Sequence, residues 1–194
     1  MTIQNKRRLQ TREAATIAVL AAVASVLFFL EIPVVLFYKL DFSNLPVLLG
    51  TFAMGPSAGA AILFIKRLLG VLHSSSQGVG ELADFLMGLA MLLPAGLIYQ
   101  RNTSRHGALL GMVAGGLCAT VAGVLTNVYI LIPCTAAVYG MPVEQKLAMG
   151  QALIPGLDTV WKFVLAITGP FNLLKWTVIC VGGWFLYKPL SPVL

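Results

Sequence analysis

The sequence predicts an all-α membrane protein, a compact bundle of six transmembrane helices that forms one integral-membrane domain over residues 1–194. Of the 194 residues, 58% are hydrophobic and only 10% are charged, and the mean hydropathy is +0.89. A soluble domain has about 25% charged residues, so this chain has too little charge to cover a surface that faces water. Apolar segments recur along the chain, and short basic groups separate them.

The first apolar segment, 14–30, follows a basic tail at 1–12 and is close to the lower length limit for a membrane span. We interpret it as a helix and not as a cleavable signal, because no A-x-A site precedes a polar chain and further apolar segments follow. Glu31 and Pro33 then interrupt the apolar pattern, which indicates a loop over 31–45.

A second helix is expected to begin near Pro46, because proline is favoured in the first turn of a helix. Asp41, Ser43 or Asn44 can cap that helix. The sequence GPSAG at 55–59 should end the second helix and start the third, since glycine and proline interrupt a continuous helix.

The later helices are separated by polar turns at 73–78 and 101–107. Their expected ranges are 58–72, 81–99, 108–132 and 172–187. Residues 134–171 are expected to form an arm outside the bundle, with short helices, because their apolar pattern is repeatedly broken.

Six helices with both termini in the cytoplasm agree best with the positions of the basic residues. A single helix over 46–72 would place the basic turn at 101–107 outside the cell. Two shorter helices place that turn on the cytoplasmic side with the N-terminus and Lys188, where Lys and Arg are enriched. The loop 31–45 and the arm 134–171 then lie on the outer face, where the loop can cap a cavity.

This topology gathers the polar residues of the membrane region near the outer face. The candidate ligand-binding residues among them are Glu81, Asn127, Asn172 and Lys175. An ionisable residue in the bilayer centre costs about 2.5–3.5 kcal/mol, so such residues are candidates for function. Lys175 and Asn172 share a helix face and could bind a carbonyl-rich ligand, although Lys175 could instead extend to the membrane interface. For Asn127, an interhelical hydrogen bond is the alternative.

Glu81 and Asp84 also share one helix face, and Lys66 and Arg67 on the preceding helix are natural partners for them. We interpret this group as an ion pair inside the bundle. Catalysis by the two carboxylates is less favoured, because no nucleophile or metal ligand accompanies them.

Other functional classes find little support in the sequence. The net charge of +6 is divided among short groups with no basic stripe interleaved with aromatic residues, so nucleic-acid binding is not expected. No zinc pattern and no GxxxxGK[ST] motif occur, so neither a metal site nor ATP hydrolysis by that route is expected. The three cysteines, Cys118, Cys134 and Cys180, are expected to be buried small hydrophobic residues.

Ala14, Ala18 and Ala22 repeat every four residues on the first helix. Small residues at this spacing form a smooth stripe that another helix can approach closely. The partner helix could belong to this chain or to a separate membrane subunit.

Four stretches of the sequence together point to one family. They are KLDFSNLPVLLGTFAMGPSAGA, GELADF, TNVYILIP and GPFNLLKW. With the alanine stripe, they resemble the riboflavin-specific substrate-binding components of energy-coupling factor (ECF) transporters, over residues 12–189. The combination of DFSxxP with PFNxxK is the most specific part of this resemblance.

The resemblance implies a multi-pass protein of a bacterial cell membrane that binds riboflavin as a transported ligand, with no cofactor and no enzymatic activity. Asn127, Asn172 and Lys175 would hydrogen-bond the flavin, and Asp41 and Leu45 would lie in the loop that closes over it. It also implies that Ala14, Ala18 and Ala22 face a transmembrane coupling subunit, which two cytoplasmic ATPases drive.

Two other functions stay open at this point. The chain could bind another vitamin or precursor, such as pantothenate or thiamine, or it could be an unrelated helical membrane enzyme. The residues 134–168 depart from the family pattern, since Asp158, Trp161 and Lys162 have no clear counterpart.

Overall fold

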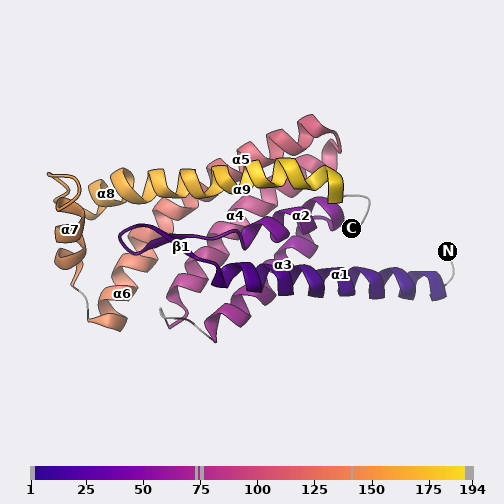
Figure 1. The fold of residues 1–194 in the computed structure, drawn as a ribbon, viewed down its shortest axis with the longest axis horizontal. Helices are drawn as coiled ribbons and strands as arrows, with labels where there is room; N and C mark the ends of the chain where they lie inside the picture. Colours follow the sequence, from indigo (N-terminus) through magenta and orange to yellow (C-terminus); the bar gives the residue numbers. More distant parts are fainter. Residues whose placement is uncertain (1–2, 73, 75–76, 141, 191–194) are drawn as a thin grey trace.

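The long apolar segments form helices that lie side by side along the long axis of the molecule (Figure 1). The structure is a computed structural model, and it describes residues 3–72, 74, 77–140 and 142–190. Residues 73, 75 and 76 of the predicted polar turn, and residues 1–2 of the predicted tail, lie outside the described residues.

The helices are α1 (Ile3–Phe29), α2 (Asn44–Met54), α3 (Pro56–Val71), α4 (Val79–Arg101), α5 (Arg105–Thr126), α6 (Ile132–Tyr139), α7 (Val143–Gln151), α8 (Val160–Phe163) and α9 (Gly169–Leu190). Two π-helical segments connect them: η1 (Asn127–Leu131) joins α5 to α6, and η2 (Val164–Thr168) joins α8 to α9. The described residues contain four helical stretches long and apolar enough to cross a membrane: Gln10–Phe29, Val79–Arg101, Arg105–Val138 and Val160–Tyr187.

The predicted break between the second and third helices is confirmed. Gly55 ends α2 with a φ of +97°, a conformation that favours glycine, and its N–H donates to the Thr51 carbonyl at 2.9 Å. Pro56 then occupies the first position of α3, where its missing N–H costs nothing.

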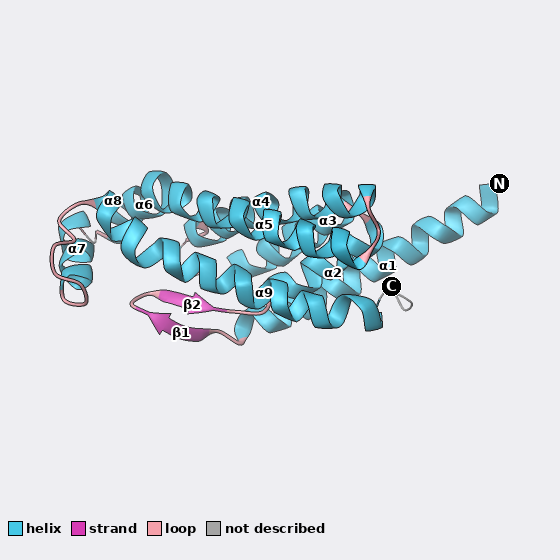
Figure 2. Cartoon of the chain, turned by 90° about the horizontal axis from the view of Figure 1, so that it is seen from above, coloured by secondary structure: helices cyan, strands magenta, loops and turns pink. Residues whose placement is uncertain are grey.

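The predicted loop 31–45 contains regular structure that the sequence analysis missed. Strands β1 (Ile32–Val35) and β2 (Tyr38–Leu40) form an antiparallel hairpin in which Ile32 pairs with Leu40. Leu36, in the turn, has a φ of +52°. Figure 2 shows this hairpin on one side of the helical layer, next to α9. Two strands this short are not stable by themselves, so contacts with the helices must hold the hairpin in place.

Helix α1 begins at Ile3, so residues 3–12 of the predicted tail are helical. The basic segment there contains three Arg and two Gln, with one Lys and one Leu, all of which favour helix. The onset of the apolar pattern at residue 14 therefore marks where the helix becomes apolar, and not where it begins.

Helix α5 packs closely on α4 and α9 through small residues spaced four apart. They are Gly107, Gly111, Gly115, Ala119 and Gly123, and all five are buried. A Cβ atom on Gly111 would lie only 2.7 Å from the carbonyl oxygen of Ala95 on α4. This small-xxx-small pattern is the usual means by which membrane helices reach close contact.

Replacing Gly111 by alanine is therefore expected to lower the free energy of unfolding by about 1–3 kcal/mol, because the added methyl group meets backbone and not a flexible side chain. Thermal unfolding in detergent measures the effect. The control is Gly116→Ala on the same helix, where the nearest atom, Cys180 Sγ, is 3.5 Å from the added Cβ. Equal losses of stability in both variants would contradict the close approach at Gly111.

The described ends of the chain lie at the same end of the bundle. In Figure 1 the start of α1, the end of α9 and the junction of α4 with α5 are all at the right. The arm that contains α6, α7 and α8 is at the opposite end, and the hairpin extends toward it. The fold thus separates the basic turn at 101–105 from the loop and the arm.

Candidate ligand-binding site

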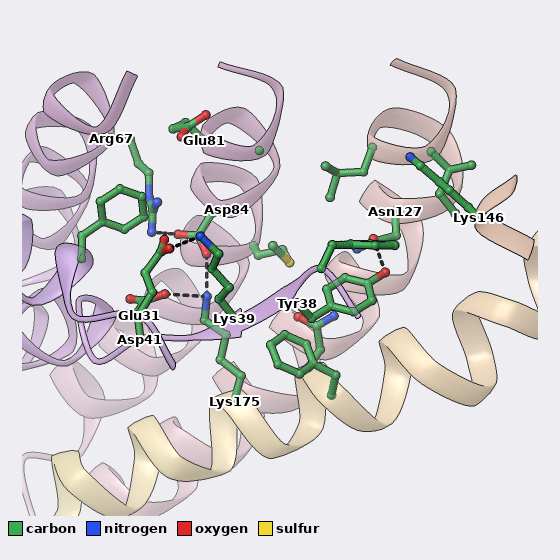
Figure 3. Close-up of a pocket in the computed structure, with 18 residues that line it drawn as sticks. Glu31, Tyr38, Lys39, Asp41, Arg67, Glu81, Asp84, Asn127, Lys146 and Lys175 are labelled. Atoms are coloured by element: carbon green, nitrogen blue, oxygen red, sulfur yellow. Dashed lines mark hydrogen bonds and ion pairs between the residues drawn. The ribbon is translucent and has the colours of Figure 1, made fainter. Parts of the chain in front are cut away.

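A cavity of about 440 Å³ lies beneath the hairpin, among α3, α4, η1, α7 and α9. Figure 3 shows the side chains that line it. They are Phe28, Glu31, Phe37, Tyr38, Lys39, Asp41, Arg67, Gly80, Glu81, Asp84, Met87, Asn127, Leu131, Ile132, Lys146, Phe171, Asn172 and Lys175. The volume is within the usual range for a small-molecule site.

The structure brings five of the six predicted ligand-binding residues to this cavity: Asp41, Glu81, Asn127, Asn172 and Lys175. Leu45 does not line it. The Leu45 side chain instead packs on the main core cluster, near Gly182 and Gly183 of α9. Leu45 therefore does not contact the cavity directly, and any role in closing the site is indirect.

One end of the cavity holds a buried charge cluster, formed by Asp41, Lys66, Arg67, Asp84 and Lys175. Lys175 Nζ lies 2.9 Å from Asp84 Oδ1 and 3.2 Å from Asp41 Oδ2 (Figure 3). Asp84 also pairs with Arg67 and, at 3.7 Å, with Lys66. The cluster thus joins α3, α4 and α9 to the segment that follows the hairpin.

These contacts decide between two interpretations left open by the sequence. Lys175 is only 5% exposed, so the alternative that it extends to the membrane interface is wrong. The predicted ion pair of Asp84 with Lys66 and Arg67 is confirmed. Glu81 is buried as well, and it accepts a hydrogen bond from Ser74 Oγ at 2.7 Å.

The DFSN stretch is fixed by the same cluster. Asp41 Oδ1 accepts hydrogen bonds from the backbone N–H of Ser43, at 2.9 Å, and from its hydroxyl. Lys66 Nζ donates to Ser43 Oγ at 2.9 Å and to Asn44 Oδ1 at 2.5 Å. Burial alone would raise the pKa of Asp41, but the ammonium groups of Lys175 and Lys66 outweigh it and hold that pKa below its usual value.

The other end of the cavity is formed by aromatic and amide side chains. The Tyr38 hydroxyl on the hairpin donates to Asn127 Oδ1 at 2.9 Å and accepts from Thr168 Oγ1 at 2.5 Å. The Tyr38 ring stacks on Phe171, with 5.0 Å between the ring centroids. Burial raises the pKa of Tyr38, so the hydroxyl stays neutral and keeps its proton for Asn127. Asn127 therefore anchors the hairpin, and not a neighbouring helix.

Asn172 lies flat against α5 because residue 123 is glycine. A Cβ atom at Gly123 would lie 2.7–2.9 Å from the amide atoms of Asn172. Asn172 Nδ2 donates to the Thr168 carbonyl at 3.0 Å. In the described part of the chain Asn172 Oδ1 has no hydrogen-bond partner, so it is free to accept a hydrogen bond from a ligand in the cavity.

Both amide residues lie next to π-helical segments, which the sequence analysis did not foresee. Asn127 begins η1, Thr168 ends η2, and the two segments contact each other. π-Helical turns are frequent at functional sites. Here the carbonyls of Gly123 and Thr168 accept hydrogen bonds from Asn127 and Asn172, at 2.7 and 3.0 Å.

Tyr38 and Lys146 also line this cavity, although no sequence pattern indicated either of them. Tyr38 could have been noticed as an aromatic residue with a hydroxyl, close to the DFSN stretch. Lys146 lies on the short helix α7; it is 6% exposed, and its Nζ lies 5.7 Å from the ring centroid of Phe37. Burial lowers the pKa of Lys146.

The remaining candidates lie away from the cavity. Ala14, Ala18 and Ala22 are exposed on α1, whereas Ala21 and Ala24 are buried against the bundle. The stripe therefore lies on the open face of α1.

The described residues contain no group of three or more His, Cys, Asp or Glu side chains that could hold a metal ion. The expectation that all three cysteines are buried is wrong for Cys118, which is exposed. Cys134 and Cys180 are partly buried.

Comparison with known proteins gives consistent results. A family model described as "ECF transporter, substrate-specific component" matches residues 12–181. "Riboflavin transporter RibU" of Staphylococcus aureus (strain TCH60) is 30% identical over 191 residues, which cover 95% of this chain and 93% of that protein. "Riboflavin transporter FmnP" of Bacillus subtilis (strain 168) is 25% identical over 190 residues, covering 95% of this chain and 94% of that protein.

A solved structure has the same fold. It is described as "Structure and mechanism of the S component of a bacterial ECF transporter" and matches with a TM-score of 0.74 at 32% identity. The match covers 95% of this chain and 98% of that one, so it includes the hairpin and the arm as well as the helical bundle.

Proposed function

Because the chain belongs to the family of substrate-specific components of ECF transporters, we propose that it binds riboflavin in the cavity beneath the hairpin and takes part in its uptake. Members of this family are substrate-binding subunits and not enzymes. The two relatives named above, which match this chain over 95% of its length, are both riboflavin transporters.

The two-ended cavity is the observation that carries the ligand assignment. Riboflavin has a flat, largely apolar tricycle with a carbonyl-rich edge, and a flexible chain of hydroxyl groups. The aromatic and amide end, with Tyr38, Phe171 and Asn172, suits the flat ring system. The buried charge cluster at the other end offers ionic and polar groups to the hydroxyl chain.

Within this proposal, Asn127 and Asn172 contact the ring system, and Lys175, Asp41 and Glu81 lie near the hydroxyl chain. Lys175 has three donors and faces two carboxylates, so one donor is left for the ligand. Leu45 acts indirectly, by holding the start of α2 against α9.

We further propose that six helices cross the cell membrane, with both termini in the cytoplasm and the hairpin and arm on the outer side. The grouping of the basic turn at 101–105 with the two ends of the chain supports this orientation, because basic residues favour the cytoplasmic side. Helices α2 and α3 are too short to span as free helices, but α2 is mostly buried in protein, which permits this.

The proposed partners are a transmembrane coupling subunit and two cytoplasmic ATPases. The exposed stripe of Ala14, Ala18 and Ala22 offers α1 to the coupling subunit. The absence of a GxxxxGK[ST] motif from the sequence agrees with ATP hydrolysis on other chains.

Replacing Ala18 by leucine is expected to lower co-purification with the coupling subunit by about tenfold or more, because the larger side chain prevents close helix contact. Riboflavin binding should be unchanged, since Ala18 is not among the cavity residues. Val19→Leu, also exposed on α1 but outside the stripe, is the control. Normal co-purification of Ala18→Leu would exclude the stripe as the docking surface.

The ligand assignment is tested with purified protein. We expect bound flavin to be visible in the absorbance spectrum, and the fluorescence of added riboflavin to be quenched in a saturable titration. Pantothenate and thiamine, added in excess, should not displace riboflavin. A preparation without flavin that binds one of these two compounds, and not riboflavin, would reassign the site to another vitamin.

A further inference from the structure

Helix α5 and the start of η1 present an exposed stripe that is apolar up to its last residue, which is a tyrosine. Its members recur every three or four residues and are 45% to 66% exposed: Leu110, Val113, Leu117, Val121, Leu125 and Tyr129. The stripe is about 30 Å long at the rise of an α-helix, which equals the thickness of the hydrocarbon core of a bilayer. Because this helical stretch is long and apolar enough to cross a membrane, the stripe is a lipid-facing surface.

The lipid-facing stripe ends at an exposed aromatic pair. Tyr129 of η1 and Trp161 of α8 pack edge to face, with 6.1 Å between their ring centroids. One turn after Trp161, Leu165 is also exposed, so the apolar surface continues along η2 toward α9. On the other side, the exposed ion pair of Asp158 with Lys162 begins the polar region. Tyr and Trp gather where a membrane meets water, so this pair marks one boundary of the bilayer.

The turn after α7 is apolar and exposed beside this aromatic pair. Leu153 is 55% exposed and Ile154 is 42% exposed. The end of α7 is held against α8, because a Cβ atom at Gly150 would lie only 2.5 Å from the ring of Phe163, two residues after Trp161. Figure 1 shows α7 running across the end of the bundle, next to α8. The fold thus fixes two exposed aliphatic side chains close to the membrane boundary.

The distribution of side chains on α7 favours a lipid surface as the partner of this turn. Near the start of α7, Glu144 and Gln145 are exposed and polar, as expected for a helix end in water. The exposed apolar residues, Met149, Leu153 and Ile154, gather at the end that packs on α8. They continue the lipid-facing surface of the long helices, so the bilayer that covers that surface also reaches this turn.

We propose that the end of α7 and the turn after it, residues 149–154, bind the surface of the bilayer. The Tyr129–Trp161 pair lies among the lipid headgroups, and Leu153 and Ile154 contact the acyl chains next to them. This inference goes beyond the proposed function, and it does not depend on which ligand the cavity takes. It means that the arm is held by the membrane as well as by the helical bundle.

Lipids that carry a nitroxide quencher measure the depth of a tryptophan in the bilayer. The full chain is placed in phosphatidylcholine nanodiscs with the nitroxide on the headgroup, near the glycerol end of an acyl chain, or near its methyl end. The difference in fluorescence between the wild type and Trp161→Phe isolates the signal of Trp161. We expect the headgroup or glycerol-end label to quench this signal about twofold or more better than the methyl-end label.

An added tryptophan tests the turn itself. The extra fluorescence of Leu153→Trp should be quenched by the glycerol-end label and little by iodide in the water. Gln145→Trp, at an exposed polar position of the same helix, is the matched control. Its extra fluorescence should be quenched by iodide and little by the labelled lipids.

Three results would overturn the proposal. Quenching of the Leu153→Trp signal by iodide alone would place the turn in water, and quenching by neither agent would mean that protein covers it. Strongest quenching of Trp161 by the methyl-end label would place the aromatic pair in the bilayer centre. Titration of the same nanodiscs with riboflavin tests the proposed function separately, because the depth of the arm is measured without any ligand.

Discussion

Replacing Asp84 by asparagine is expected to lower the free energy of unfolding by about 3–5 kcal/mol, as found when one partner of a buried ion pair is removed. Asp84 is the centre of the buried charge cluster, where its carboxylate pairs with Arg67, Lys66 and Lys175. Asparagine has nearly the same shape, so the loss would come from charge and not from packing. The cations that remain would be buried with a single carboxylate, that of Asp41.

The charge balance of the cluster makes this prediction specific. Its three cations and two carboxylates leave one excess positive charge. Asp84→Asn would raise the excess to two charges, whereas Lys175→Met would remove it. We therefore expect Asp84→Asn to be clearly less stable than Lys175→Met, although both variants lose the ion pair between Asp84 and Lys175.

Thermal or denaturant unfolding in detergent micelles measures both variants. Asp158→Asn is the matched control, because Asp158 pairs with Lys162 on the surface of the arm and both side chains are more than half exposed. That variant should change stability little, since exposed ion pairs contribute little. If Asp84→Asn unfolded like the wild type, or if Lys175→Met were the less stable variant, the account of the cluster as an unbalanced buried network would fail.

The features that the sequence predicted well depend on local or strongly directional physics. The break at Gly55–Pro56 follows from backbone geometry, and the pairing of Asp84 with Arg67 follows from the cost of unpaired charge in a bilayer. The convergence of Asn127, Asn172 and Lys175 on one cavity follows from topology, once the basic turn is placed opposite to them.

The features that could not be predicted from the sequence depend on contacts between distant segments. The hairpin is short and contains a proline, and Tyr38 ties it to Asn127 and Thr168, which are 89 and 130 residues away. The segments η1 and η2 differ from α-helix only in hydrogen bonds shifted by one residue, and apolar periodicity does not detect that shift. Lys146 lines the cavity from α7, a helix that packs on Phe163 through Gly150.

Replacing Asn172 by alanine is expected to weaken riboflavin binding by about 10- to 100-fold, because the Oδ1 acceptor toward the cavity disappears. The cost in stability should be small, about 1 kcal/mol, since the hydrogen bond that is lost is neutral and lies within one helix. Fluorescence titration and thermal unfolding of the ligand-free protein measure the two effects separately.

The close contact between Gly123 and the Asn172 amide leads to a second prediction. Gly123→Ala should weaken riboflavin binding although Asn172 itself is unchanged, because the added methyl group occupies the place of the Asn172 amide. Thr177→Ala, on an exposed part of α9 outside the cavity, is the control and should bind riboflavin normally. Gly123→Ala with wild-type affinity would show that the orientation of Asn172 against α5 does not matter for binding. Weak binding by Asn172→Ala alone would then assign the effect to the amide group, independently of how α5 positions it.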